Sequence, residues 1–354
     1  EGELMNNQHR QGLRAALAVA VSLFAASTVV ASAATAAPPQ GEVTKIENLA
    51  YGPASPGNLL DLYLPETRGK AKLPLIIWHS GSAWQSNTTK NAGNSVLIAE
   101  EFTTRGYAVA AVSVRSSADA RFPAQGHDAR AAVRWLRENA ATYGIDPNRF
   151  AVMGDSSGGW AAAFTAMTSD IHELPGEEGV DGTSSAVQVA VPFFPPTDFL
   201  SMDAFAEEHG LPQGFAYPHD SPTSPEGRLI HCPGEVYPTQ LVSIQECPDE
   251  TRAADPASYV EGAEITIWVL HGLEDVLLPF NQSQQLYSAT TEEGNEARFS
   301  LVPTAGHNVW QVIDSPAATT WIANRGGQEQ VVEGAGPTWD EIEQFIHTNL
   351  SRAR

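Results

Sequence analysis

A serine flanked by small residues is the first candidate for chemistry in this sequence. The run Gly154–Gly158 has the spacing G-x-S-x-G, with Ser156 at its centre. Residues 149–153 before it predict a short buried strand, and the apolar run 160–167 after it predicts a helix. A sharp strand-to-helix turn of this kind exposes the serine hydroxyl and points the first N–H groups of the helix at the site of attack. Ser156 is therefore the predicted nucleophile.

An acid and a base follow in the chain order that such a nucleophile requires. Asp275 lies in a loop just after the predicted strand 264–271, and His307 lies in a loop just after the predicted strand 297–303. Loops at the carboxyl ends of parallel strands share one rim of a sheet, so we expect the three side chains to meet there. Ser156 would attack a carbonyl carbon, His307 would accept its proton, and Asp275 would hold the imidazole tautomer.

A second aspartate is an alternative acid. Asp198 also follows a predicted strand, at 187–194, while Asp275 could instead cap the helix that begins near Pro279. The position of Asp275, after the penultimate strand and before the histidine loop, favours it over Asp198.

The loop after an early strand predicts the other half of an oxyanion site. Residues 75–78 form a short apolar strand, and His79 opens a run of small residues that ends at Trp84. The backbone N–H groups of Gly81 and Ser82 are the predicted donors, with the Ser157 N–H opposite them. Serines at positions 80 and 82 leave open which two amides donate. His79 is interpreted as a structural residue that braces this loop.

Alternating strands and helices predict an α/β fold with a mostly parallel sheet of eight strands and helices on both faces. The first two strands have no helix between them and should form an antiparallel hairpin at one edge. The clearest helices are expected at 128–143, 282–290 and 339–350. The strands are expected near 43–50, 58–64, 74–79, 107–114, 149–154, 187–194, 264–271 and 297–303.

An insert at 199–252, after the sixth strand, interrupts this pattern. Loops at this end of the sheet carry binding residues, so the insert is expected to form a cap over the site. It holds both cysteines of the chain, Cys232 and Cys247, which we expect to form a disulfide, with two free buried thiols as the alternative. Aromatic residues expected to line a substrate slot are Trp84, Trp160, Phe194 and Trp310 of the body, with Phe205, Phe215, Tyr217 and Tyr237 of the insert.

Residues 5–36 have the features of a secretory signal, and residues 37–354 would form the hydrolytic domain. Basic residues precede an apolar run at 15–30, and small residues with A-x-A cleavage patterns follow it. We therefore expect a secreted protein; the apolar run is short for a membrane anchor. The formal net charge of −22 argues against nucleic acid and anionic membranes as partners. No metal-ligand spacing occurs at His127, His172, His209, His219, His231 or His347.

The sequence from Phe122 through the 154–158 turn, with the blocks 255–260 and 271–283, resembles α/β-hydrolase serine esterases. The resemblance is to the branch of acetyl xylan and feruloyl esterases, near the hormone-sensitive-lipase group, and it covers residues 43–350. It implies hydrolysis of carboxylic esters by a Ser-Asp-His triad without a cofactor. We also expect no metal and no obligate protein partner. The implied substrates are small or polysaccharide-linked esters, with acetyl or feruloyl groups on plant polysaccharides. Alternatives are a lipase or polyester hydrolase, a serine peptidase, and a non-catalytic hydrolase-fold binding module.

Overall fold

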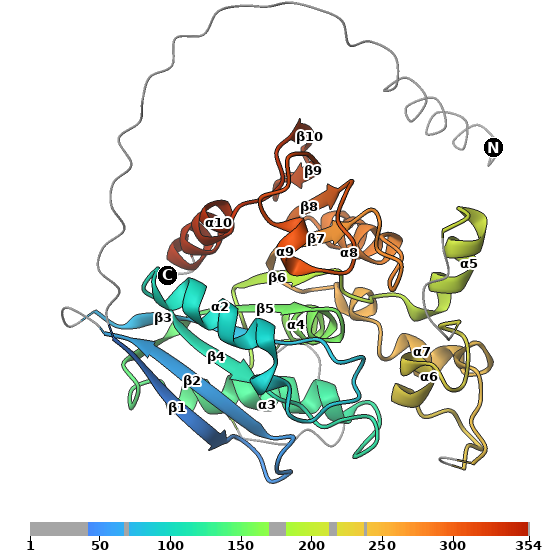
Figure 1. Cartoon of the computed structure of the whole chain (residues 1–354), viewed down its shortest axis with the longest axis horizontal. Coiled ribbons are helices and arrows are strands. Elements are labelled where there is room, and N and C mark those ends of the chain that lie inside the picture. The colour runs from blue at the N-terminus through green and yellow to red at the C-terminus, as the bar shows by residue number, and fades with distance from the viewer. Residues whose placement is uncertain (1–41, 67–70, 170–181, 212–217, 237–238, 353–354) are drawn as a thin grey trace, which may run out of the picture. The chain divides into compact units, whose positions relative to one another are not determined.

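A mixed sheet forms the centre of the fold in the computed structural model, which describes residues 42–66, 71–169, 182–211, 218–236 and 239–352. The predicted signal at 5–36 lies outside the described residues. Within them, ten strands follow the order β1-β2-β4-β3-β5-β6-β7-β8-β9-β10 (Figure 1). They are β1 (Val43–Ala50), β2 (Leu59–Pro65), β3 (Leu73–His79), β4 (Ala108–Val112), β5 (Ile145–Asp155), β6 (Val189–Phe193), β7 (Thr266–Gly272), β8 (Glu296–Val302), β9 (Ala318–Ala323) and β10 (Glu329–Gly334).

The predicted α/β class and the antiparallel first hairpin are confirmed, but the strand count is wrong. Strands β4, β3, β5, β6, β7 and β8 pair in parallel, and β1 pairs with β2 antiparallel. The two additional strands, β9 and β10, form an antiparallel hairpin beside β8. Its outer strand is exposed along its length, so it lacks the apolar alternation that identified the other strands.

Alternation along the buried strands divides the core into two layers. Leu75 and Ile77 of β3 belong to one buried cluster, while Ile76 and Trp78 belong to the other, because successive strand side chains point to opposite faces. Helices α3 (Ala124–Glu138), α4 (Ser157–Thr168) and α8 (Asn281–Glu292) contribute to the first cluster. Helices α2 (Gly93–Thr103) and α10 (Trp339–Arg352) contribute to the second. Helices therefore cover both faces of the sheet, as predicted.

The insert at 199–252 contains short helices between irregular segments. They are η2 (Phe199–Ser201), α5 (Met202–Glu208), α6 (Pro225–Leu229), η3 (Ile244–Glu246) and α7 (Pro248–Arg252), followed by η4 (Pro256–Tyr259). In Figure 1, α5, α6 and α7 stand together beyond the α4 side of the sheet. Three of the insert's aromatic candidates, Phe215, Tyr217 and Tyr237, lie outside the described residues.

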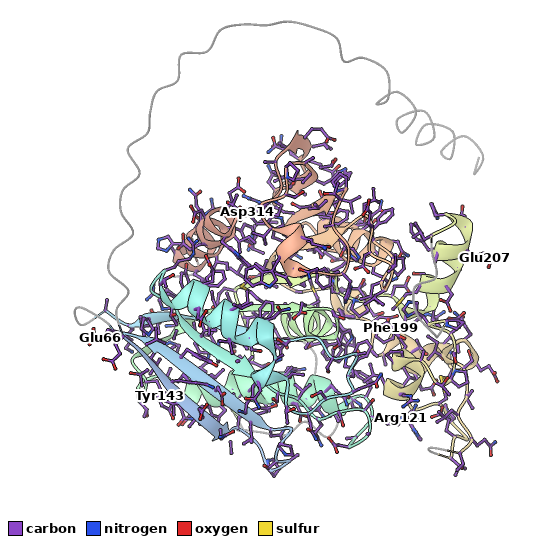
Figure 2. All side chains as sticks on the ribbon, in the orientation of Figure 1. Glu66, Arg121, Tyr143, Phe199, Glu207 and Asp314 are labelled. Carbon is purple, nitrogen blue, oxygen red and sulfur yellow. A yellow bond between two sulfur atoms is a disulfide. The ribbon has the colours of Figure 1, made fainter. Side chains whose placement is uncertain are left out.

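A third apolar cluster joins the insert to the body. Trp84 and Trp160 of the body share it with Phe199 of the insert, which is labelled in Figure 2. The Trp84 and Phe199 ring centroids are 5.6 Å apart. The buried cysteines Cys232 and Cys247 belong to the same cluster and form the predicted disulfide. An ion pair of 2.6 Å between Arg121 Nη1 and Glu235 Oε2 adds a polar contact between body and insert.

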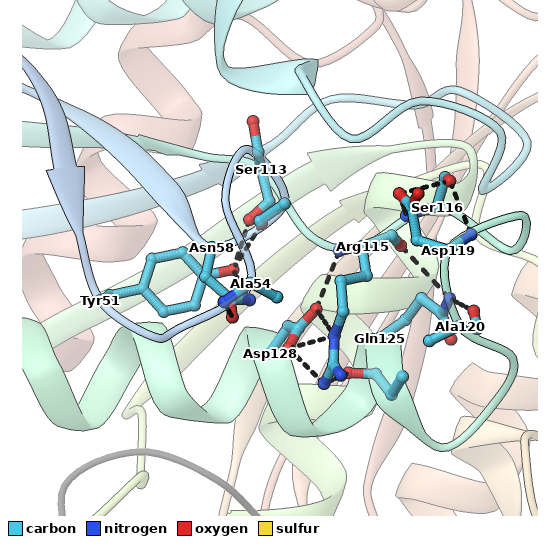
Figure 3. Close-up of polar contacts among 12 residues, drawn as sticks. Tyr51, Ala54, Asn58, Ser113, Arg115, Ser116, Asp119, Ala120, Gln125 and Asp128 are labelled. Carbon is cyan, nitrogen blue, oxygen red and sulfur yellow. Dashed lines mark hydrogen bonds and ion pairs between the residues drawn. The ribbon is translucent and has the colours of Figure 1, made fainter.

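Polar contacts fix the segment between β4 and α3 (Figure 3). The buried Asp128 carboxylate of α3 accepts a hydrogen bond from the Arg115 backbone N–H at 2.8 Å. It also forms an ion pair with the Arg115 guanidinium at 2.8 Å. Two residues later, the Ser117 N–H donates to the Trp84 carbonyl at 2.7 Å. Asp128 therefore fixes the segment around Arg115, and this segment is hydrogen-bonded to the loop that follows β3. Charge-assisted contacts of this kind are stronger than neutral hydrogen bonds.

The disulfide should stabilise the fold measurably. Its two cysteines are 15 residues apart, and closing a loop of that length in the unfolded chain is worth about 3 kcal/mol on the entropic model. We expect Cys232→Ser/Cys247→Ser to unfold at lower temperature than the parent protein in calorimetry. Reductant should lower the melting temperature of the parent protein and leave that of the double variant unchanged. Equal melting temperatures for the two proteins would contradict this expectation.

Candidate active site

Ser156 lies at the turn between β5 and α4, where the backbone is in an unusual conformation. Its φ and ψ angles are 58° and −127°, in a region that side-chain-bearing residues rarely occupy and that is costly unless the surroundings enforce it. The Ser156 N–H donates to the Phe193 carbonyl of β6 at 3.0 Å. The turn is therefore fixed to the neighbouring strand, and the serine begins a helix, as predicted.

The two glycines of the motif are required by close approach of backbone atoms. A Cβ on Gly154 would lie 2.2 Å from the Gly158 carbonyl oxygen, and one on Gly158 would lie 2.0 Å from the His79 carbonyl oxygen. Contacts this short cannot be relieved by side-chain movement because both neighbours are backbone atoms. The small residues thus let the nucleophile turn pack directly against the loop after β3.

Asp275 and His307 lie in the loops after β7 and β8, and their side chains meet. The distance between His307 Nδ1 and Asp275 Oδ2 is 2.7 Å. The other carboxylate oxygen, Oδ1, accepts hydrogen bonds from the Leu277 and Leu278 N–H groups at 2.8 and 3.0 Å. The ring of Phe194 packs on the His307 ring with centroids 4.3 Å apart. The imidazole is therefore held by a carboxylate at one nitrogen and by an aromatic ring on its face.

Asp275 is ionised despite its burial. Burial by itself would raise the pKa of the Asp275 carboxyl, but contacts with His271 and His307 outweigh burial and hold the pKa well below its usual value. His271 is fully buried; its Nε2 lies 3.4 Å from Asp275 Oδ2 and 3.1 Å from the Leu278 carbonyl oxygen. Sequence analysis did not assign His271 a role, although the four-residue spacing to Asp275 was visible.

The alternative acid, Asp198, makes different contacts. Its backbone N–H donates to Gln282 Oε1 at 2.8 Å, and its carbonyl accepts from Gln282 Nε2 at 2.9 Å. Among the described residues, no histidine forms a hydrogen bond or an ion pair with the Asp198 side chain. The geometry therefore places Asp275, and not Asp198, in contact with His307.

A small cavity brings the predicted nucleophile and base together. Ser156, Ser157 and His307 line one cavity of about 120 Å³. Its remaining walls are formed by Ala83, Trp84, Pro196, His219, Pro225, Glu226, Leu277 and Leu278. One site is thus formed by the loop after β7 that carries Asp275 (the acid loop), the loop after β3 and the insert.

The loop after β3 presents a different amide from those predicted. The Gly81 N–H donates to Asp155 Oδ1 at 3.1 Å, and the Ser82 N–H donates to the Ser157 hydroxyl at 2.9 Å. Within the described chain, the N–H groups of Ala83 and Ser157 donate no hydrogen bond, and both residues line the cavity. Ala83 therefore fits the donor role better than Gly81 or Ser82. Its backbone has φ at 52°, which the sequence does not reveal.

Of the four aromatic residues of the body that were predicted to line a substrate slot, Trp84 lines the cavity. Trp160 and Phe194 are buried in the surrounding packing, whereas Trp310 is exposed. Trp160 is fully buried and donates its indole N–H to the Ala254 carbonyl at 2.7 Å. Phe194 packs against His307, and Trp310 donates to Asn94 Oδ1 at 3.2 Å. Phe205 of the insert stacks on His209 with centroids 4.0 Å apart. Burial and apolar character alone did not distinguish these positions from a substrate wall.

Asp155, next to the nucleophile, connects three segments. Besides Gly81, its carboxylate accepts from Asn94 Nδ2 of α2 at 3.2 Å, and Asn94 in turn accepts from Trp310. Burial raises the pKa of the Asp155 carboxyl.

Among the described residues, no three His, Cys, Asp or Glu side chains are grouped as a metal site would require. In the same part of the chain, no helix is long and apolar enough to span a membrane.

Comparison with known proteins agrees with this architecture. The BD-FAE family model matches residues 60–290, and a secretory lipase model matches residues 258–334. Among curated proteins, the esterase LipQ of Mycobacterium tuberculosis is 26% identical over 262 residues, which cover 73% of this chain and 56% of LipQ. The probable carboxylic ester hydrolase LipM of the same organism is 26% identical over 239 residues, 67% of this chain and 49% of LipM. The chain thus spans about half the length of these relatives.

Solved structures show the same fold. A truncated carbohydrate esterase from gut microbiota superposes with a TM-score of 0.66 and 28% identity, covering 87% of this chain and 96% of that one. A bifunctional GH43-CE protein of Bacteroides eggerthii gives a TM-score of 0.63 and 28% identity over 75% of this chain and 35% of its own. The match of the family model over most of the described domain decides the assignment. The chain belongs to the BD-FAE family and has the α/β-hydrolase fold.

Proposed function

We propose that this protein is a secreted carboxylic ester hydrolase that forms an acyl-enzyme on Ser156. The observation that carries the proposal is the 2.7 Å contact between His307 Nδ1 and Asp275 Oδ2 beside a cavity that Ser156 and His307 both line. The esterase names of the relatives support the reaction type. The signal-like residues 5–36 support export.

The mechanism follows from the position of one proton. The ionised Asp275 carboxylate accepts a hydrogen bond from the Nδ1–H group of His307, which leaves Nε2 as the lone-pair nitrogen that can accept the Ser156 proton. The serine oxygen then bonds to the ester carbonyl carbon, and the tetrahedral intermediate collapses as His307 protonates the departing alcohol. Water, deprotonated by the same imidazole, releases the acid and restores Ser156. The N–H groups of Ala83 and Ser157 would bind the oxyanion, each worth about 3 kcal/mol.

The size of the cavity favours a short acyl group. Its volume of about 120 Å³ is below the roughly 300–1,000 Å³ of pockets that enclose drug-sized ligands, and it must hold the acyl group together with the part of the alcohol nearest the ester. This supports an acetyl group over the bulkier feruloyl group. The carbohydrate esterase neighbour, at 28% identity, supports a sugar as the alcohol. We therefore propose acetyl esters of plant polysaccharides as the substrates, in preference to feruloyl esters or the long-chain esters that a lipase cleaves.

Replacement of the nucleophile should abolish turnover and leave the fold intact. Ser156→Ala should lower kcat/KM for p-nitrophenyl acetate by at least about 10⁴-fold, because members of such a triad act as a unit. Its melting temperature should match that of the parent protein, since the turn is held by backbone contacts. An active Ser156→Ala protein would contradict the mechanism.

The two candidate acids can be separated by a matched pair of variants. Asp275→Asn should lower kcat by about 10³- to 10⁴-fold, because an amide in that position stabilises the wrong imidazole tautomer. Asp198→Asn makes the same chemical change in a carboxyl that does not contact His307, so its kcat should stay within about twofold of the parent value. The reverse pattern in the same assay would move the acid to the loop after β6.

The catalytic acid should add no ionisation of its own to the pH dependence. The pKa of Asp275 is lowered, so its carboxylate remains charged well below neutral pH and does not titrate in the working range. The kcat/KM value for an uncharged ester should rise with pH, because only a neutral imidazole can accept the serine proton. EDTA should leave the profile unchanged. A rate that falls with pH over this range, or that requires an added divalent ion, would be inconsistent with a neutral imidazole base.

A further inference from the structure

One charged pair of the insert faces the cavity and has no part in the mechanism above. Glu226 lies in α6 and is 2% exposed, yet it lines the same cavity as Ser156 and His307. Its neighbours on that wall include Pro225, Leu277 and Leu278. A carboxylate in such surroundings is costly unless it is paired and hydrogen-bonded.

His219 supplies one partner. Its Nδ1 lies 3.2 Å from Glu226 Oε2. Burial would lower the pKa of His219, but the contacts with Glu226, the charge of Asp203 and a backbone hydrogen bond with Leu277 outweigh burial and raise the pKa to about 9. The His219 backbone N–H also donates to Asp203 Oδ1 at 3.0 Å. His219 is therefore a cation held between α5, α6 and the loop that carries Asp275, and it lies against the Glu226 carboxyl group.

The Glu226 carboxylate still has acceptor capacity. Its Oε2 is buried against His219, and within the described part of the chain no N–H or O–H group donates a further hydrogen bond to the carboxylate. A carboxylate can accept about four hydrogen bonds, and a buried acceptor that lacks donors costs free energy. Because Glu226 lines the cavity that holds the nucleophile, a substrate can supply a donor to the other oxygen, Oε1.

We propose that Glu226, held by His219, is a specificity residue that accepts a hydrogen bond from a free hydroxyl group on the alcohol portion of the ester. This inference rests on the proposed function. The acetyl group has no hydrogen-bond donor and neither does the ester linkage, so the donor must belong to the alcohol. A sugar offers a hydroxyl next to its acetylated position. An alkyl alcohol of the same size leaves the carboxylate unpaired on binding.

A site that hydrogen-bonds a substrate hydroxyl rejects analogues that lack it, because the buried polar group is then left without a partner. The parent protein should therefore prefer a mono-acetylated methyl xyloside to cyclohexyl acetate, a ring ester of similar size without hydroxyl groups. We expect a ratio of kcat/KM values of about 10 to 100, the range for a hydrogen bond to a charged group.

The variant Glu226→Gln tests the residue itself. It should lower kcat/KM for the xyloside acetate by about 10-fold or more and leave that for cyclohexyl acetate within about twofold, because the triad is untouched. Glu246→Gln, an exposed glutamate of the same insert, is the control and should change neither value. Glu226→Asp, which retains the charge but shortens the side chain, should recover part of the preference for the xyloside.

Two results would overturn the inference. One is a parent protein that cleaves both acetates equally well. This test uses the parent protein alone and so does not depend on the folding of a variant. The other is a Glu226→Gln protein that loses activity on both esters in equal proportion, since the pair would then support the fold of the site and not select substrate. A parent protein that cleaves neither ester, nor p-nitrophenyl acetate, would instead reject the proposed function.

Discussion

Close packing of the nucleophile turn against the loop after β3 is the constraint on which the rest of the site depends. The His79 carbonyl oxygen occupies the place of a side chain on Gly158, 2.0 Å from where its Cβ would lie, and a Cβ on Gly81 would lie 2.7 Å from that of Ser156. Only at this distance can the Asp155 carboxylate accept the Gly81 N–H and Ser157 accept the Ser82 N–H. These bonds leave the amides of Ala83 and Ser157 for substrate. Pre-positioned donors of this kind cost no reorganisation during the reaction.

Charge is arranged around the cavity in two buried clusters with different roles. Asp275 lies between His271 and His307, and its N–H donors come from its own loop. Glu226 lies against His219 and belongs to the insert. Both oxygens of the Asp275 carboxylate have partners, which fixes its orientation. Glu226 has the His219 contact alone and lines the cavity, which suits the recognition that we propose. Both pairs meet near Leu277, which donates to Asp275 and contacts His219, so the insert and the acid loop are coupled.

The parts of the site that the sequence predicted are those encoded by local patterns. The spacing around Ser156, and loops that directly follow apolar strands, predicted His307 and favoured Asp275 over Asp198, and Asp275 is the aspartate that contacts His307. The choice of Ala83 could not be predicted, because it depends on hydrogen bonds to Asp155 and Ser157 from distant segments. The hairpin β9-β10 was missed because an exposed edge strand has no apolar alternation. Glu226 was missed because nothing in the insert's composition shows that one carboxylate of many faces the cavity.

The proposed mechanism requires transfer of an acyl group to Ser156. Rapid acid quenching of the protein during turnover of an acetyl ester, followed by peptide mass spectrometry, tests this step. We expect one acetyl group on the peptide that contains Ser156. After acylation by a highly activated ester, a variant that lacks the His307 imidazole should hold more of this acetyl group, because it cannot activate water. An acetyl group on another residue would contradict the mechanism. So would turnover without modification of Ser156 under conditions that trap the acyl-enzymes of serine esterases.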